Sequence, residues 1–114
     1  MIMTSLTTDL QLILTQRLNV SYSDIEDVCQ RWKIEEMALF GSVLRDDFNE
    51  DSDVDVLVVF QEKPGWSLFD LMDLQDELQK RFNRPVDIVQ KKELNNPYRR
   101  QEILKIHQLV YEQK

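Results

Sequence analysis

Residues 54–60, VDVLVVF, have the composition of a buried strand apart from one aspartate, Asp55. A second aspartate, Asp53, immediately precedes this segment. Because side chains alternate along a strand, both carboxylates share one face with Leu57 and Val59. The other face carries Val54, Val56, Val58 and Phe60. Residues two apart lie about 6.6–6.8 Å apart along a strand, close enough to converge on one or two cations. This spacing therefore predicts a site for divalent metal ions.

A third carboxylate stands in a similar apolar setting, at Asp87 within PVDIV. Val86 and Ile88 take one face of that strand and Asp87 takes the other, so Asp87 joins the first pair if the two strands are neighbours. Three ionised carboxylates close together repel one another and raise one another's pKa values. Mg²⁺ removes this conflict, since it prefers carboxylate oxygens, waters and substrate phosphates as ligands. We predict that Asp53, Asp55 and Asp87 bind Mg²⁺.

Two simpler interpretations compete with a catalytic metal site. A lone aspartate at the start of a strand often faces solvent or caps a loop, but three on matching faces are harder to explain in that way. The second alternative is a calcium loop, because Asp47, Asn49 and Asp51 fit the first half of an EF-hand. An EF-hand requires Gly at its sixth position and Glu at its twelfth, where this chain has Ser52 and Val58. We reject the calcium loop.

The composition limits the class of protein. The chain has 114 residues, 42% of them hydrophobic and 31% charged, as expected for one globular domain. Its formal net charge of −7 argues against direct DNA or RNA binding, which draws on clustered Lys and Arg. No apolar run approaches the roughly 18 residues that span a bilayer, so we expect a cytoplasmic protein without membrane contact. The single Cys29 is expected to be a small core residue.

Apolar spacing and capping residues predict four helices. The first is expected at residues 8–19, and the second begins at a Ser23–Glu26 capping box. The third is expected to begin at a Ser67–Asp70 capping pattern and to run to about residue 82, and the fourth follows Asn96-Pro97. The last helix is expected to carry Ile103, His107, Val110 and Tyr111 on one face.

Three strands are expected at residues 36–40, 54–60 and 84–90, with a turn or loop at 63–65. The first two are natural neighbours in a sheet. The predicted fold is therefore a small mixed α/β domain with a short mixed sheet and flanking helices.

The first of these strands ends at a Gly-Ser pair, and this pair makes the pattern specific. Gly41-Ser42, ten further residues and then Asp53-Val54-Asp55 form the G-S-x10-D-x-D signature of the polymerase β-like nucleotidyltransferase superfamily. The chain resembles the smallest members, the minimal nucleotidyltransferase (MNT) domains, over residues 20–111. The resemblance implies a nucleotidyltransferase (polymerase β-like) fold in a single domain, with N-terminal helices at 1–33 and the catalytic core at 34–114.

The resemblance also implies roles for named residues. Asp53, Asp55 and Asp87 would hold two Mg²⁺ ions and Asp87 would help to deprotonate the acceptor, while Gly41, Ser42 and Arg45 would bind the phosphates of ATP. One departure concerns Arg45: relatives commonly carry G-S-x-A-R-G, whereas here Leu44 and Asp46 flank the arginine. An arginine among acids is also a common surface ion-pair partner, and this alternative stays open for Arg45.

Minimal members of the family are typically paired with a HEPN-domain protein, often a ribonuclease toxin. The resemblance therefore implies an antitoxin that transfers AMP from ATP to a tyrosine of that partner. No second domain is expected within the 114 residues, so the acceptor would come from a separate molecule. Two alternatives are a non-enzymatic module that masks the partner and a nucleotidyltransferase that modifies a small molecule.

Overall fold

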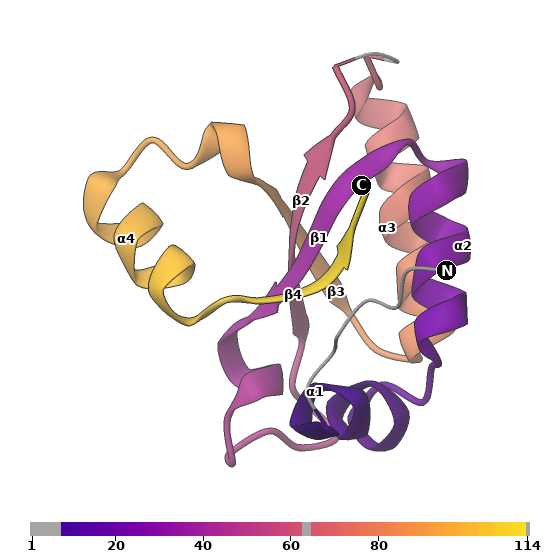
Figure 1. Ribbon diagram of the computed structural model, residues 1–114, viewed down its shortest axis with the longest axis vertical. Coiled ribbons are helices and arrows are strands. Elements are labelled where there is room, and N and C mark those ends of the chain that lie inside the picture. The colour runs from indigo at the N-terminus through magenta and orange to yellow at the C-terminus, as the bar shows by residue number, and fades with distance from the viewer. Residues whose placement is uncertain (1–7, 63–64, 114) are drawn as a thin grey trace.

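The protein is built on a four-stranded mixed sheet (Figure 1). The computed structural model describes residues 8–62 and 65–113. The strands are β1 (Ile34–Phe40), β2 (Val54–Phe60), β3 (Val86–Gln90) and β4 (Gln108–Glu112), in the spatial order β3-β2-β1-β4. β1 is antiparallel to β2 and β4, and β2 is parallel to β3. This confirms the predicted mixed α/β class and the pairing of the first two strands.

One face of the sheet is covered by two helices, α2 (Tyr22–Arg31) and α3 (Leu68–Phe82) (Figure 1). The valines of β2 that point to this side are fully buried, and the apolar faces of both helices pack against them. Cys29 is buried in α2, as predicted for a core residue. The principal core therefore lies between the sheet and these two helices, and it includes Ile25, Val28, Val54, Val56, Val58, Leu74 and Leu78.

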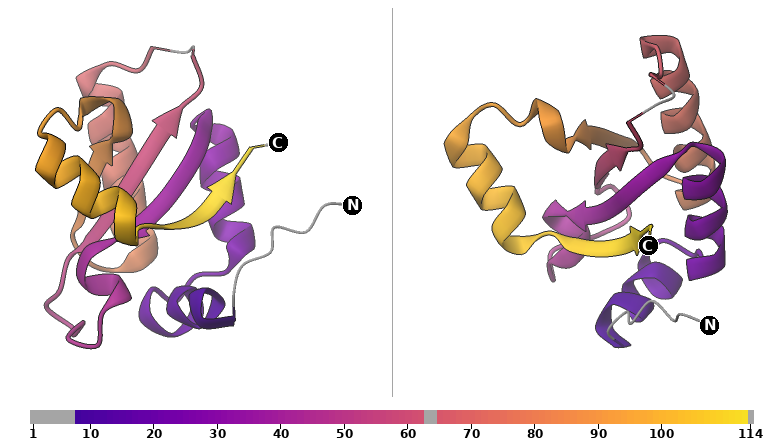
Figure 2. Two further views of the ribbon diagram at one scale, coloured as in Figure 1. Left: turned by 60° about the vertical axis from the view of Figure 1, so that its left-hand side comes forward. Right: turned by 45° about the horizontal axis from the view of Figure 1, so that its top comes forward.

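The opposite face carries the 3₁₀ turn η3 (Lys91–Glu93) and the helix α4 (Pro97–Ile106), which stands off the sheet (Figure 2). A smaller apolar cluster joins them to the sheet through Ala38, Phe40, Leu57, Leu94 and Ile103. On this face Asp87 is exposed and Asp55 is half-buried, so the carboxylates that project from it are accessible in the described part of the chain.

The chain between residues 8 and 17 forms α1 (Thr8–Leu12) and a π-helical turn, η1 (Ile13–Arg17). This agrees with the predicted first helix, and Leu10, Leu14 and Leu18 bury its apolar side. Of the turn predicted at residues 63–65, only Gly65 belongs to the described residues. None of the helices described in the structure is both long enough and apolar enough to cross a membrane.

Two of the predicted helix starts are confirmed atom by atom. Ser67 Oγ accepts the backbone N–H of Asp70, and Asp70 Oδ2 accepts the backbone N–H of Ser67, which is a capping box. Asn96 Oδ1 accepts backbone N–H groups at the start of α4, with Pro97 in the first turn.

The predicted start of α2 is wrong by two residues. The capping box is made by Ser21 and Asp24 in place of Ser23 and Glu26. Both tetrads fit Ser-x-x-acid, so the pattern alone does not choose between them. The earlier box lengthens the helix and turns Tyr22 towards the core cluster, which favours it over the later one.

The predicted C-terminal end of the last helix is also wrong. α4 ends at Ile106, His107 is extended, and the next residues form β4 along the free edge of β1. Val110 and Tyr111, expected on a helix face, are buried in this strand instead. A β-branched and an aromatic residue suit a strand, and the unpaired edge of β1 supplies backbone partners that an isolated helix pattern cannot anticipate.

Candidate active site

The parallel pairing of β2 and β3 brings the predicted acids together. Asp55 and Asp87 are direct neighbours in the register of the two strands, so both side chains project from the same face of the sheet. Asp53 lies immediately before β2, two residues from Asp55. Asp55 is half-buried, whereas Asp53 and Asp87 are exposed. The face is the one that α4 only partly covers, since Leu57 on the same side packs with Ile103.

The electrostatics of this cluster favour a bound cation. Burial raises the pKa of the Asp55 carboxyl, and the negative charges of Asp87 and Asp53 raise it further. The guanidinium groups of Arg45 and Arg99 act in the opposite direction and lower the pKa. A half-buried carboxylate between two others is costly to ionise, and a divalent cation would relieve that cost.

The donor set suits Mg²⁺ in its chemistry. All three side chains offer oxygen, and Mg²⁺ usually takes one or two protein carboxylates and completes its shell with waters and substrate phosphates. Among residues 8–62 and 65–113, no three His, Cys, Asp or Glu side chains are gathered closely enough to enclose an ion by themselves. An ion at these carboxylates would therefore need further ligands, which waters and substrate phosphates can supply.

Gly41 is fitted against the central carboxylate. It follows the last residue of β1, Phe40, which pairs with Asp55, and it begins the 3₁₀ turn η2 (Gly41–Leu44). Its φ of +79° lies in the region that glycine adopts most easily. A Cβ at this position would lie 3.2 Å from Asp55 Cγ and closer still to Oδ2. Only glycine leaves the carboxylate and the turn in their places, and Ser42 Oγ donates to the Asp53 carbonyl at 3.4 Å.

The loop between η2 and β2 is held by residues that the sequence analysis did not identify. Arg17 Nη1 donates to the carbonyls of Val43 and Arg45, at 2.8 and 2.6 Å. Arg84 Nη1 donates to the carbonyls of Asn49 and Ser52 at the other end of the loop, at 2.9 and 3.0 Å.

The same two guanidinium groups lie over the ring of Phe48, with Cζ 5.5 Å (Arg17) and 4.3 Å (Arg84) from its centroid. These cation–π contacts clamp the loop that carries the ten residues between the Gly-Ser pair and the acids. No local sequence signal reveals the clamp, because its members lie far apart in the chain.

Arg45 lies at the edge of the site. Its Nε makes an ion pair with Asp47 Oδ1 at 3.1 Å, and its side chain is 57% exposed. This geometry is that of a surface ion pair, which was the alternative to phosphate binding for Arg45. Its charge still acts on Asp55, so a contact with phosphate stays a prediction.

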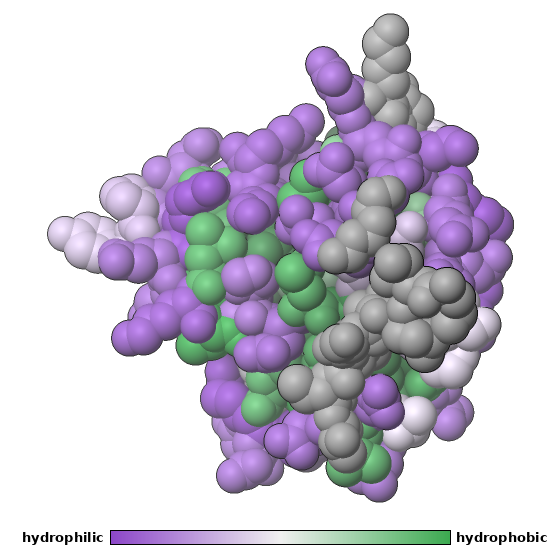
Figure 3. Space-filling model, viewed as in Figure 1, coloured by the Kyte–Doolittle hydropathy of each residue, from purple (hydrophilic) through white to green (hydrophobic). Residues whose placement is uncertain are grey.

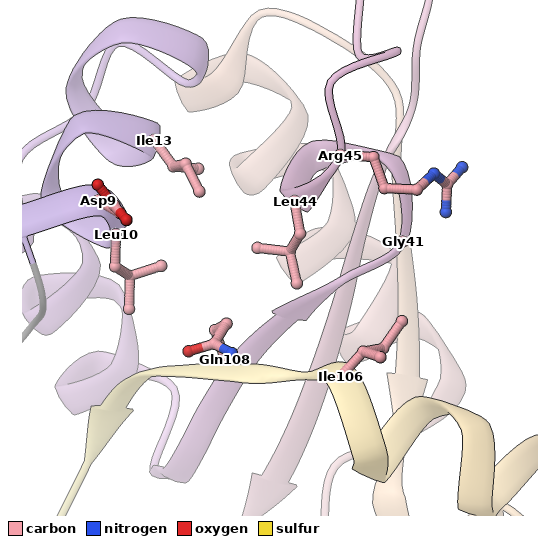
Figure 4. Close-up of a pocket in the computed structure, with 8 residues that line it drawn as sticks. All are labelled: Asp9, Leu10, Ile13, Gly41, Leu44, Arg45, Ile106 and Gln108. Carbon is pink, nitrogen blue, oxygen red and sulfur yellow. The ribbon is translucent and has the colours of Figure 1, made fainter.

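A cavity of about 550 Å³ adjoins the Gly-Ser turn (Figure 4). Leu10, Ile13, Leu44 and Ile106 point into it, whereas Arg45 points away. Apolar side chains also gather on this side of the molecule, framed by polar ones (Figure 3). Gly41 lines the cavity and also contacts the Asp55 carboxylate, whereas the three aspartates of the site do not line the cavity.

Known proteins resemble this chain in sequence and in architecture. The family model described as a nucleotidyltransferase domain matches residues 25–110. A protein adenylyltransferase, MntA, of Thermococcus cleftensis is 37% identical over 71 residues, which cover 62% of this chain and 70% of that protein. A Methanocaldococcus jannaschii protein described as a candidate protein adenylyltransferase is 37% identical over 68 residues, covering 60% of this chain and 68% of that protein.

Solved structures agree with the sequence relatives. A candidate minimal nucleotidyltransferase has a TM-score of 0.66 and 32% identity, with 84% of this chain and 93% of that one covered. A toxin–antitoxin complex with AMP-PNP has a TM-score of 0.67 at 16% identity, covering 83% and 76%, and this likeness concerns the fold alone. The family model spans most of the chain and contains both the Gly-Ser turn and the three aspartates. The chain belongs to the nucleotidyltransferase domain family and has the fold of its minimal members.

Proposed function

We propose that this protein is a Mg²⁺-dependent adenylyltransferase that transfers AMP from ATP to a tyrosine hydroxyl of a partner toxin. The observation that carries the proposal is the packing of Gly41 on the Asp55 carboxylate, with Asp87 beside it in register. This arrangement unites a turn suited to phosphate with carboxylates suited to metal on one face of the sheet. The resemblance to named protein adenylyltransferases supports a protein as the acceptor.

The residues divide the reaction between them. Asp53 and Asp55 would hold Mg²⁺, which would stabilise charge on the attacking and leaving oxygens of an in-line displacement. Gly41 N–H and Ser42 Oγ would orient the β- and γ-phosphates. The acceptor oxygen attacks the α-phosphorus, the bond from the α-phosphorus to the bridging oxygen breaks, and pyrophosphate leaves. Asp87 would ligate metal on the acceptor side and take the proton of the acceptor hydroxyl.

We infer that the partner is a HEPN-domain toxin and that modification makes this protein its antitoxin. Solved structures with this fold include a toxin–antitoxin pair named MntA–HepT, at a TM-score of 0.59 and 16% identity. The acidic net charge of −7 is suited to steering towards a basic RNA-cleaving partner. The single-domain division at residue 33 and the cytoplasmic location stay predictions from the sequence.

The test is the intact mass of the co-encoded partner after incubation with this protein, Mg²⁺ and each nucleoside triphosphate. The active-site variant is Asp53→Asn with Asp55→Asn. The matched control is Glu50→Gln with Asp51→Asn, which removes the same charge from the exposed loop. An added AMP that requires Mg²⁺ and the two site aspartates supports the proposal.

The two alternatives predict different masses. A masking module would suppress the partner's ribonuclease activity with no mass change, and the active-site variant would suppress it equally well. An enzyme acting on a small molecule would release pyrophosphate from ATP without the partner present. Either result would contradict transfer to the partner's tyrosine.

A further inference from the structure

The first turn of α4 carries an arginine, Arg99, on the helix that packs against the carboxylate face through Ile103. Asn96 Oδ1 accepts the backbone N–H of Arg99 at 3.1 Å, which fixes the start of the helix. Ile103, four residues later, is buried in the cluster that contains Leu57, on the same sheet face as Asp55. Residues four apart share one side of a helix, so Arg99 projects from the side of α4 that faces the sheet.

Arg99 differs from the other arginines of the chain. Within the described residues it is the one arginine whose side chain makes no hydrogen bond or ion pair. Each of the others donates to a carboxylate or a backbone carbonyl: Arg17, Arg31, Arg45, Arg81, Arg84 and Arg100. Arg99 is nevertheless near enough for its charge to act on Asp55. Its guanidinium thus lies within electrostatic reach of Asp55 and pairs with none of the described carboxylates, so its donors are free for an anion.

The charges beside the Gly-Ser turn indicate that a triphosphate would need a further cation. Arg45 is paired with Asp47, and Asp46 adds a further negative charge beside it. The turn itself therefore offers little free positive charge to a triphosphate. Arg99 can supply it from α4, with a planar fork of donors that matches two phosphate oxygens.

We propose that Arg99, from α4, binds the β- and γ-phosphates of the nucleotide, opposite Gly41 and Ser42. This role rests on the proposed nucleotidyl transfer. As the bond from the α-phosphorus to the bridging oxygen breaks, negative charge grows on the departing pyrophosphate. Arg99 then stabilises the leaving group in the transition state as well as in the bound substrate. The site thus takes an anionic polyphosphate, and α4 is one wall of it.

The experiment compares binding of AMP-PNP and of AMP, each with Mg²⁺, by isothermal titration calorimetry. The variant is Arg99→Gln, and the matched control is Arg100→Gln, which removes the same charge from the adjacent residue, where the guanidinium donates to the Lys91 carbonyl. Loss of a charge-assisted hydrogen bond predicts about tenfold to a hundredfold weaker AMP-PNP binding by Arg99→Gln. AMP lacks the β- and γ-phosphates, so its affinity should stay within about twofold, as should both affinities of the control.

The outcomes separate this role from the proposed function. Wild-type protein that binds AMP-PNP, together with Arg99→Gln that binds it equally well, would overturn the role of Arg99 and leave nucleotidyl transfer standing. Equal losses for AMP and AMP-PNP would also overturn the role, because they would place Arg99 on the nucleoside or the α-phosphate. Wild-type protein that binds no AMP-PNP would overturn the proposed function itself. Normal AMP-PNP binding with lost transfer to the partner would assign Arg99 to the acceptor instead.

Discussion

Replacing Gly41 by alanine tests whether the Gly-Ser turn is fitted to the central carboxylate. The substitution adds one methyl group at a residue whose φ is +79°, and that methyl would collide with the Asp55 carboxylate. The chain offers a matched control in Gly65, whose φ is +70° and whose added Cβ would meet none of the described residues within 4 Å. Gly65→Ala therefore carries the backbone strain without the collision.

The two substitutions should differ by the energy of the collision. A positive φ costs an alanine roughly 1–2 kcal/mol at either position. At Gly41 the carboxylate must also retreat by roughly 1 Å, and overpacking of this kind costs about 1–3 kcal/mol. We expect Gly41→Ala to lower the free energy of unfolding by about 2–5 kcal/mol in total. It should also abolish AMP transfer, because the displaced carboxylate belongs to the proposed metal site.

Urea denaturation at constant pH measures both costs, provided that the slope with urea concentration does not change between variants. An Asp55→Ala background removes the colliding atoms. In that background Gly41→Ala should cost no more than Gly65→Ala does, which is a coupling of about 1–3 kcal/mol. Equal costs for Gly41→Ala and Gly65→Ala in the wild-type background, or a coupling near zero, would refute the fit between turn and carboxylate.

Three further predictions concern the site and its support. Asp55→Asn should stabilise the fold at neutral pH, because the pKa of Asp55 is raised in the folded state and its ionised form therefore costs stability above that pKa. In thermal melts this gain in stability should shrink as the pH falls through the pKa of Asp55. A variant that is less stable than the wild type at pH 7 would contradict the prediction. Leu74→Ala, in the buried core, should cost about 2–5 kcal/mol in urea denaturation, whereas Leu68→Ala, 71% exposed on the same helix, should cost almost nothing. Arg84→Met should cost roughly 1–3 kcal/mol and expose the loop around Phe48 to limited proteolysis, and an unchanged cleavage rate would argue against the clamp.

The acids of the site were predictable because their pattern is local. Alternation along one strand predicts that Asp53 and Asp55 share one face, and the structure has Asp55 within β2 and Asp53 immediately before it. The position of Asp87 needed one more condition, that the two strands be neighbours, and the register of β2 with β3 meets it. The contact between Gly41 and Asp55 was not predictable, since it depends on the antiparallel pairing of two strands.

The errors lie where one pattern allows two structures. The segment HQLVYE continues a helical spacing but also suits a strand, and the free edge of β1 decides in favour of the strand. The two overlapping capping patterns near Ser21 and Ser23 are a smaller case of the same ambiguity. The clamp of Arg17 and Arg84 on Phe48 is different, because contacts between residues so far apart leave no periodic signal in the sequence.

The two faces of the sheet divide stability from chemistry. Along β2, Val54, Val56 and Val58 are fully buried against α2 and α3, while Asp55, on the other side of the same strand, is half-buried beside like charges. Such a carboxylate destabilises the folded state, and the large apolar core on the opposite face offsets that cost. Conservative substitutions among the valines should therefore change stability before they change activity. Substitutions on the carboxylate face should change activity first, and some of them should make the protein more stable.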